Sequence, residues 1–99
     1  MRYDKEILIQ RVDDVYTENG NYEETVLYEY KVYGSVVATD IDTLRLVYGE
    51  IRQNTLTVHV QNHIDVVFNR MLIDGVPYTV DHKINQRVKQ AFVISQCQG

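Results

Sequence analysis

The two-residue period of residues 25–37 constrains the fold more than any other feature of the sequence. Two sets of side chains alternate along this segment: Val26, Tyr28, Tyr30 and Val32 in one set, and Leu27, Glu29, Lys31 and Tyr33 in the other. Successive side chains of a β-strand point to opposite faces, whereas those of a helix repeat every 3.6 residues. The segment therefore predicts a long β-strand. Gly34 within it predicts a bulge or bend, which a small barrel needs at its corners.

Further strands are predicted on both sides of this one. Apolar or alternating runs mark them at residues 5–12, 55–61, 71–73, 76–80 and 87–96. The dipeptides Asn19-Gly20 and Asp74-Gly75 separate neighbouring runs, and both tolerate the positive φ angles of a two-residue type I′ turn. In a chain of 99 residues, this pattern predicts one domain over residues 1–99 that is mainly β. We expect a small antiparallel β-barrel of five to six strands, with a sandwich as the alternative.

Residues 38–55 carry a pattern that fits two kinds of secondary structure. One helical face would hold four apolar residues: Ile41, Leu44, Tyr48 and Ile51. A strand would align three: Leu44, Leu46 and Tyr48. Asp40 is able to cap the start of a helix, and Gly49 weakens either structure. The segment therefore predicts one long loop or a short helix inserted into the barrel, whose apolar side chains a neighbouring subunit would bury.

Charge is unevenly distributed along the chain. Residues 1–50 carry five basic and eleven acidic side chains, and residues 51–99 carry five basic and three acidic ones. Most of the acidic excess lies in one region: Asp13, Asp14, Glu18, Glu23, Glu24 and Glu29. A solvated hairpin explains this bias, and so does a surface that faces a polyanion without adhering to it. The net charge of −4 disfavours general attraction to nucleic acid or anionic membranes.

Metal-binding patterns are weak in this sequence. His59 and His63 have the i, i+4 spacing of zinc ligands on a helix, but the surrounding alternation predicts a strand, in which they would lie roughly 13 Å apart. Asp40 and Asp42, followed by Glu50, resemble the start of a calcium loop, yet arginine stands where such a loop needs glycine. Acidic residues at a helix N-terminus explain them better. We expect no bound metal.

Catalytic and nucleic-acid-binding patterns are equally weak. The single cysteine, Cys97, can form no intrachain disulfide, and the sequence has neither a nucleophile elbow nor a glycine-rich phosphate loop. Tyr28, Tyr30 and Tyr33 would suit base stacking, but Lys31 is the one cation among them and acidic residues lie nearby. The sequence also lacks an apolar stretch long enough to span a membrane. We therefore expect no enzymatic activity, no cofactor and no membrane partner.

Taken in order, these elements resemble the head–tail adaptor, or head-closure, family of tailed bacteriophages. The resemblance covers roughly residues 6–82 and rests on the order and spacing of several pieces. These are an opening strand that ends in Ile9-Gln10-Arg11, the Asn19-Gly20 turn, the aromatic-rich strand from Tyr28 to Val37, a variable segment at 38–53, the strand from Thr57 to Val60, and the run from Met71 to Val80 around Asp74-Gly75.

The resemblance implies a structural protein of the virion without enzymatic activity. It implies a ring, commonly of twelve copies, that lies at the head–tail joint after assembly in the host cytoplasm. Its partners would be further copies of itself, a portal-bound adaptor protein and a tail terminator protein, with packaged DNA passing close by. The predicted subunit-interface or channel residues are Asp40, Ile41, Asp42, Leu44, Arg45, Val47, Tyr48 and Ile51, and Asn19, Gly20, Asp74 and Gly75 are predicted as structural turns. The alternatives are a tail-end completion protein and a monomeric small-barrel module that binds peptide or single-stranded nucleic acid.

Overall fold

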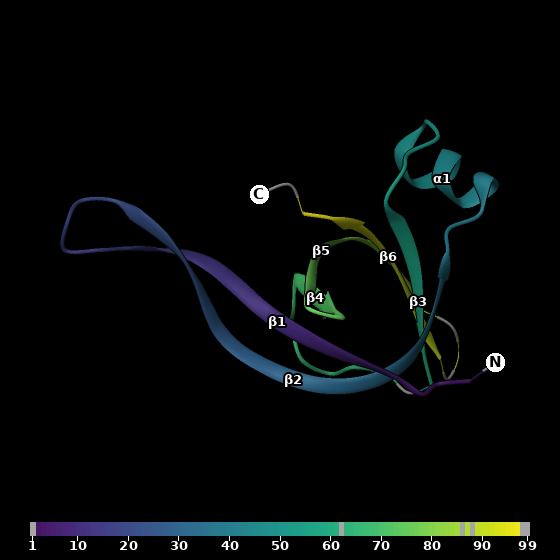
Figure 1. Ribbon diagram of the computed structural model, residues 1–99, viewed down its shortest axis with the longest axis horizontal. Coiled ribbons are helices and arrows are strands. Elements are labelled where there is room, and N and C mark those ends of the chain that lie inside the picture. Colours follow the sequence, from purple (N-terminus) through teal and green to yellow (C-terminus); the bar gives the residue numbers. More distant parts are fainter. Residues whose placement is uncertain (1, 62, 86, 88, 98–99) are drawn as a thin grey trace.

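The computed structural model describes residues 2–61, 63–85, 87 and 89–97, and its main body is a ring of strands (Figure 1). Within these residues lie six strands and one helix: β1 (Lys5–Tyr16), β2 (Tyr22–Ala38), α1 (Ile41–Tyr48), β3 (Thr55–Val60), β4 (Arg70–Ile73), β5 (Val76–Asn85) and β6 (Gln90–Gln96). Neighbouring strands pair antiparallel in the order β1-β2-β3-β6-β5-β4, and β4 returns to β1, so that the sheet closes. The mainly β fold with a small antiparallel barrel is confirmed.

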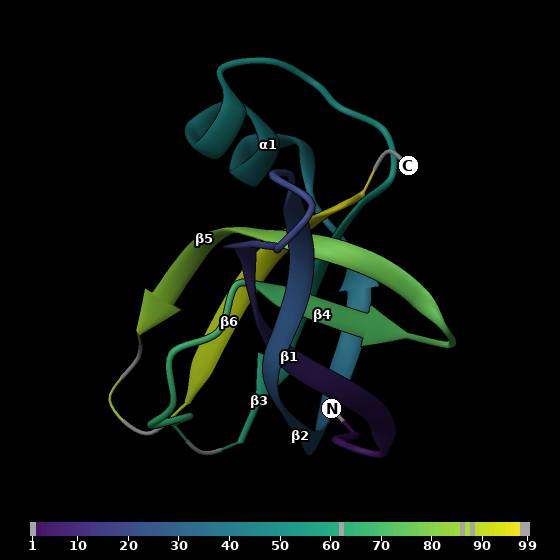
Figure 2. The same ribbon diagram turned by 90° about the vertical axis from the view of Figure 1, so that its left-hand side faces the viewer.

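Every strand in the core contributes residues that are two positions apart, as a pleated sheet with one buried face requires. The buried side chains of the core cluster are Ile7, Ile9, Val58, Val60, Met71, Ile73, Phe92 and Ile94. They come from β1, β3, β4 and β6, and Phe68 packs edge-on against Phe92 with ring centroids 5.2 Å apart. Figure 2 shows why these strands can share one interior: β4 and β5 run across the direction of β2 and β3. Alternation in the sequence thus marks the core residues directly.

Gly34 lies where β2 passes from one partner strand to the other. It is paired with Lys5 of β1 on one side and with Val60 of β3 on the other. A Cβ atom at this position would lie 2.7 Å from the carbonyl oxygen of His59, which explains the glycine by close approach of two backbones. Of the bulge or bend predicted at Gly34, the bulge is wrong, because the register shifts of the described ladders lie between Arg11 and Val12 of β1 and between Val80 and His82 of β5.

The two predicted turns differ in outcome. Asp74 and Gly75 have φ angles of 53° and 77° between paired residues of β4 and β5, so the two-residue turn with positive φ at both positions is confirmed. The two-residue turn at Asn19-Gly20 is wrong, because β1 and β2 are joined by the longer loop 17–21. The backbone N–H of Thr17 donates to the carbonyl of Asn21 at 2.8 Å and closes this loop, in which Gly20 alone has positive φ.

The hairpin of β1 and β2 is longer than the sequence predicts. β1 continues to Tyr16 instead of ending near Val12, and β2 begins at Tyr22 instead of Thr25. The extra residues project from the barrel as a two-stranded ribbon, seen at the left of Figure 1. We call residues 13–27 the arm. The described part of the chain contains no helix long and apolar enough to cross a membrane.

Candidate functional site

The helix α1 occupies the segment whose pattern was ambiguous, and its ends explain why it forms. The carboxylate of Asp40 accepts a hydrogen bond from the backbone N–H of Thr43, and the hydroxyl of Thr43 also donates to it. This hydroxyl is the main reason that the pKa of Asp40 lies below its ordinary value. Gly49 ends the helix with φ of 75°, and its N–H donates to the carbonyl of Arg45 at 2.9 Å. Of the two alternatives for residues 38–55, the short helix is confirmed.

Two side chains of α1 attach it to the end of the barrel. Leu44 is the buried residue of the helix, with 4% of its surface exposed. The Tyr48 hydroxyl donates to the carboxylate of Asp81 on β5. Partial burial and this negatively charged acceptor raise the pKa of Tyr48 to about 12. The guanidinium of Arg52 lies 4.6 Å from the Tyr48 ring centroid, which adds a cation–π contact to the same anchor.

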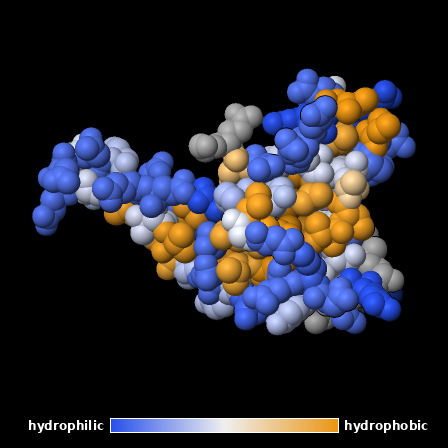
Figure 3. Space-filling model, in the orientation of Figure 1, coloured by the Kyte–Doolittle hydropathy of each residue, from blue (hydrophilic) through white to orange (hydrophobic). Residues whose placement is uncertain are grey.

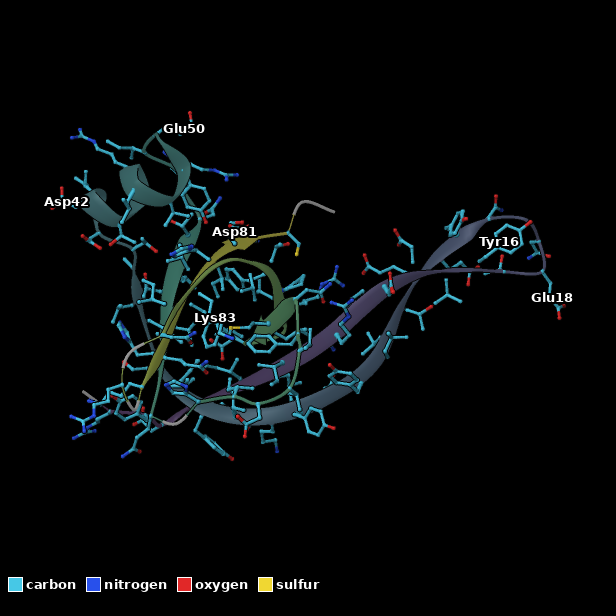
Figure 4. The ribbon with its side chains drawn as sticks, turned by 180° about the vertical axis from the view of Figure 1, so that it is seen from behind. Tyr16, Glu18, Asp42, Glu50, Asp81 and Lys83 are labelled. Atoms are coloured by element: carbon cyan, nitrogen blue, oxygen red, sulfur yellow. The ribbon has the colours of Figure 1, made fainter. Side chains whose placement is uncertain are left out.

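The outward side of α1 remains uncovered in the single chain. Ile41 and Leu46 expose 54% and 83% of their surface, and Ile51, just beyond the helix, exposes 58%. In Figure 3 the apolar residues of this region appear as an orange patch above the barrel. Asp42 and Glu50 lie at opposite ends of the helix in Figure 4. The predicted interface residues therefore include two that hold the helix, Leu44 and Tyr48, and two that face outward, Ile41 and Ile51. Leu46, which was not among the predicted interface residues, also faces outward.

The other predicted interface residues take positions between these groups. Val47 is partly buried, whereas Asp42 and Arg45 are exposed. The predicted structural turns lie at the two hairpin ends described above, one in the arm and one in the barrel. His59 and His63 belong to β3 and to the segment after it, and no group of three potential metal ligands occurs among the residues that the structure describes.

The arm is the second surface that the single chain leaves uncovered. Its acidic side chains, Asp13, Asp14, Glu18, Glu23 and Glu24, have no basic residue among them in the sequence. The other residues carry nine acidic and ten basic side chains, so the arm accounts for the whole negative charge of the chain. Tyr16 and Tyr22 face each other across the strands near its tip, 64% and 72% exposed, and their ring centroids are 5.4 Å apart. Figure 4 shows Tyr16 and Glu18 at this tip, far from the barrel.

Local electrostatics work against the arm as an isolated hairpin. Asp14 and Glu24 are directly paired across the two strands, an arrangement that destabilises a sheet. Arg70 of β4 compensates at the base of the arm by binding the Glu24 carboxylate, and this bond lowers the pKa of Glu24. The side chain of Asn69 marks where β1 leaves the barrel, because it both accepts from and donates to the backbone of Val12 at 2.8 Å. Beyond that point the strands of the arm pair with each other only, within the described ladders.

A groove lies on the side of the barrel that carries the N-terminal residues. It has a volume of about 500 Å³, and three tyrosines line it: Tyr3, Tyr30 and Tyr33. Lys31 also lines it, and the ammonium of Lys89 lies 5.8 Å from the Tyr3 ring centroid. The sequence analysis singled out Tyr30, Tyr33 and Lys31 of β2 as candidate binding residues. The contributions of Tyr3 and Lys89 could not be read from the sequence, because their segments meet only in the closed barrel.

Comparison with known proteins gives the fold and no function. No family model and no curated protein matches the chain. The solution structure of protein SF1141 from Shigella flexneri 2a superposes on it with a TM-score of 0.73 over 96% of this chain and 93% of that one, at 14% sequence identity. At this level of identity the match supports a shared architecture alone. It extends over nearly the full length of both chains.

Proposed function

We propose that this protein is a structural component of the neck of a tailed-bacteriophage virion. Copies of it form a ring between the portal-bound adaptor and the tail, close the DNA-filled head and provide the face on which the tail docks. The family resemblance of residues 6–82 suggests this role. The fold is compatible with it, because a filled barrel with projecting elements is a suitable building block for a ring.

The observation that carries the proposal is the pair of uncovered surfaces on the single chain. An isolated two-stranded hairpin is at best marginally stable in water, and exposed apolar side chains on a projecting helix mark an interaction surface. The arm is such a hairpin, and its Tyr22 is 72% exposed. The helix α1 carries such side chains on its outward side, where Leu46 is 83% exposed. A subunit completed by its neighbours accounts for both surfaces, whereas a monomeric module leaves them unexplained.

The charge of the chain also suits a ring through which DNA passes. Each copy carries a net charge of −4, so a ring of copies creates a negative field along its axis. Such a field repels phosphates and lets the genome slide past without adhering.

The deciding experiment is disruption of the gene in the phage that encodes this chain, followed by electron microscopy of the particles. We expect tailless heads that lose their DNA, and normal tailed virions when the intact gene is supplied from a plasmid. Normal virions without the gene would exclude the neck role. Complete heads and tails with defective tail ends would instead indicate the tail-end alternative.

A binding measurement separates the ring from the monomeric module. Fluorescence anisotropy with a labelled single-stranded oligonucleotide tests the tyrosine-lined groove directly, at low micromolar protein and two salt concentrations. We expect no salt-dependent binding in this range. Clear binding that weakens with salt would favour the nucleic-acid module.

A further inference from the structure

The tip of the arm combines two properties that are seldom exposed together. Tyr16 and Tyr22 form an aromatic pair with most of its surface in water, and acidic side chains flank it on both strands. Aromatic side chains carry much of the binding energy in protein interfaces, and a concentration of one charge selects a partner of the opposite sign. A surface that serves only to repel DNA requires the charge but not the tyrosines.

The groove has the complementary chemistry. Tyr3 and Tyr30 offer aromatic side chains to it, whereas Tyr33 belongs to the opposite face of β2. Its volume of about 500 Å³ is in the range of pockets that take whole side-chain-sized groups. Two cations lie at it: Lys31 lines it, and the ammonium of Lys89 lies 5.8 Å from the ring centroid of Tyr3. Arg87 precedes Lys89 in the loop between β5 and β6. The acidic residues of this end are Asp4, Asp65 and Glu6, the last of which is 3.5 Å from the Lys31 ammonium.

The pairing register shows that these cations belong to one end of the barrel. Lys5, Gly34, Val60 and Gln90 form a continuous row across β1, β2, β3 and β6. Arg87 and Lys89 lie just before Gln90 and so extend beyond this edge. Arg2, which precedes β1, lines a second groove together with Lys5 and Gly34.

The arm cannot reach the groove of its own chain. β1 lines the groove with Ile9 and ends at the arm tip at Tyr16, and seven residues of strand extend on the order of 23 Å away from the groove. The molecule measures 46 Å along its longest axis, and the arm projects from one end of it (Figure 1). A contact between arm and groove must therefore join two copies.

We propose that the arm of one copy docks in the tyrosine-lined groove of the next copy, with Tyr16 and Tyr22 against its tyrosines and the arm carboxylates against its cations. This inference rests on the proposed function for its setting, a ring of identical subunits. Two different surfaces meet in each contact, so the association is head to tail and closes into a ring if the rotation between copies permits. Pairing of two arms with each other is disfavoured, because their charges repel.

Cysteine cross-linking tests the contact in the full-length chain. In a Cys97→Ser background, a chain with Asn19→Cys at the arm tip is mixed with a chain carrying Gln61→Cys in the groove. The matched control replaces Gln61→Cys with Glu50→Cys, which is also exposed but lies beside α1. We expect the 19–61 disulfide to form about tenfold faster than the 19–50 disulfide, because docking raises the local concentration of the two thiols. Equal rates would overturn the proposal.

Charge exchange provides a second test that leaves the barrel core unchanged. Glu18→Lys with Glu23→Lys in one chain should weaken self-association by about tenfold or more in sedimentation velocity. Arg87→Glu with Lys89→Glu in another chain should do the same, and a mixture of the two should recover association. Unfolding temperatures of both variants serve as the folding control. Association that neither variant changes, or a wild-type chain that stays monomeric at high concentration, contradicts arm docking.

The outcomes also separate this proposal from the function on which it rests. If particles made without the gene lack tails while the cross-links show no preference, the neck role stands and arm docking is wrong. If particles made without the gene are normal while the 19–61 disulfide forms selectively, arm docking stands and the neck role is wrong. If the Arg87→Glu, Lys89→Glu chain loses oligonucleotide binding and keeps its association, the groove is a nucleic-acid site and the proposal is wrong.

Discussion

The two halves of the β1–β2 hairpin share a backbone conformation but differ in what stabilises them. In the barrel half, Ile7 and Ile9 are completely enclosed, and β1 pairs with β4 as well as β2. In the arm, side chains on both faces are exposed, and each strand has one partner. Burial of apolar surface dominates folding stability, whereas an isolated ladder contributes little. The barrel half thus carries the fold, and the arm is a feature whose stability depends on what binds it.

The largest expected difference between the two regions comes from truncating aromatic side chains. Phe92→Ala removes an enclosed core ring that contacts Phe68 and should lower the free energy of unfolding by about 3–5 kcal/mol. Tyr22→Ala removes a ring of similar size from the arm and should change the free energy of unfolding by less than about 0.5 kcal/mol. Urea denaturation of both variants measures these values. A large loss for Tyr22→Ala would mean that the arm belongs to the cooperative core.

Replacing glycines tests whether a glycine is needed for close packing of two backbones only in the barrel. Gly34→Val places a side chain against the His59 carbonyl and should destabilise the fold by about 1–3 kcal/mol. In the arm, a Cβ atom at Gly20 would meet only the Tyr16 hydroxyl, at 3.7 Å. The unfolding temperature should therefore fall far more in Gly34→Val than in Gly20→Val. Equal shifts would show that packing does not explain Gly34.

The two positive-φ turns offer a smaller and cleaner contrast. Gly75 and Gly20 have φ angles of 77° and 82°, so valine is strained at both positions. Gly75→Val strains a turn within the barrel and should cost about 1 kcal/mol or more in global stability. Gly20→Val strains a hairpin that opens separately, so its effect should appear in hydrogen exchange of the arm and not in the melting temperature. An unchanged melting temperature for Gly75→Val would contradict the strained turn.

The smallest effect concerns how α1, unlike the arm, is attached to the barrel. The pKa of Tyr48 is raised to about 12, so the folded protein holds this proton more tightly than the unfolded chain. The stability that the protonated Tyr48 hydroxyl contributes is complete below about pH 10 and is lost as the pH rises from about 10 to about 12. Ultraviolet titration should show one late tyrosine step that disappears in Tyr48→Phe. Persistence of that step in the variant would place it on another tyrosine.

The sequence predicted the barrel half well because its pattern records burial. Alternation identified Val58 and Val60, Asp74-Gly75 identified a turn, and Asp40 identified the start of the helix, all from local physical preferences. The sequence analysis missed the length of the arm. Tyr16 and Tyr22 favour a strand whether or not anything covers them, so their identity does not show that a paired ribbon projects from the barrel. The available signal was the stretch from 13 to 24, which holds five acidic residues and no basic one. The groove could not be predicted, since it joins the N-terminal residues, β2 and the segment after β3.

The continuity of β2 has a mechanical consequence. This strand runs without interruption from Tyr22 in the arm to Ala38, two residues before the Asp40 cap of α1. A pull on the arm along β2 therefore loads the hydrogen bonds of its ladders with β1 and β3 in shear, so that many bonds bear the force at once. Tension applied at one projecting element would reach the other through a single stiff strand. The subunit thus contains a direct force path between its two uncovered surfaces, anchored where Gly34 brings the backbones of β2 and β3 together.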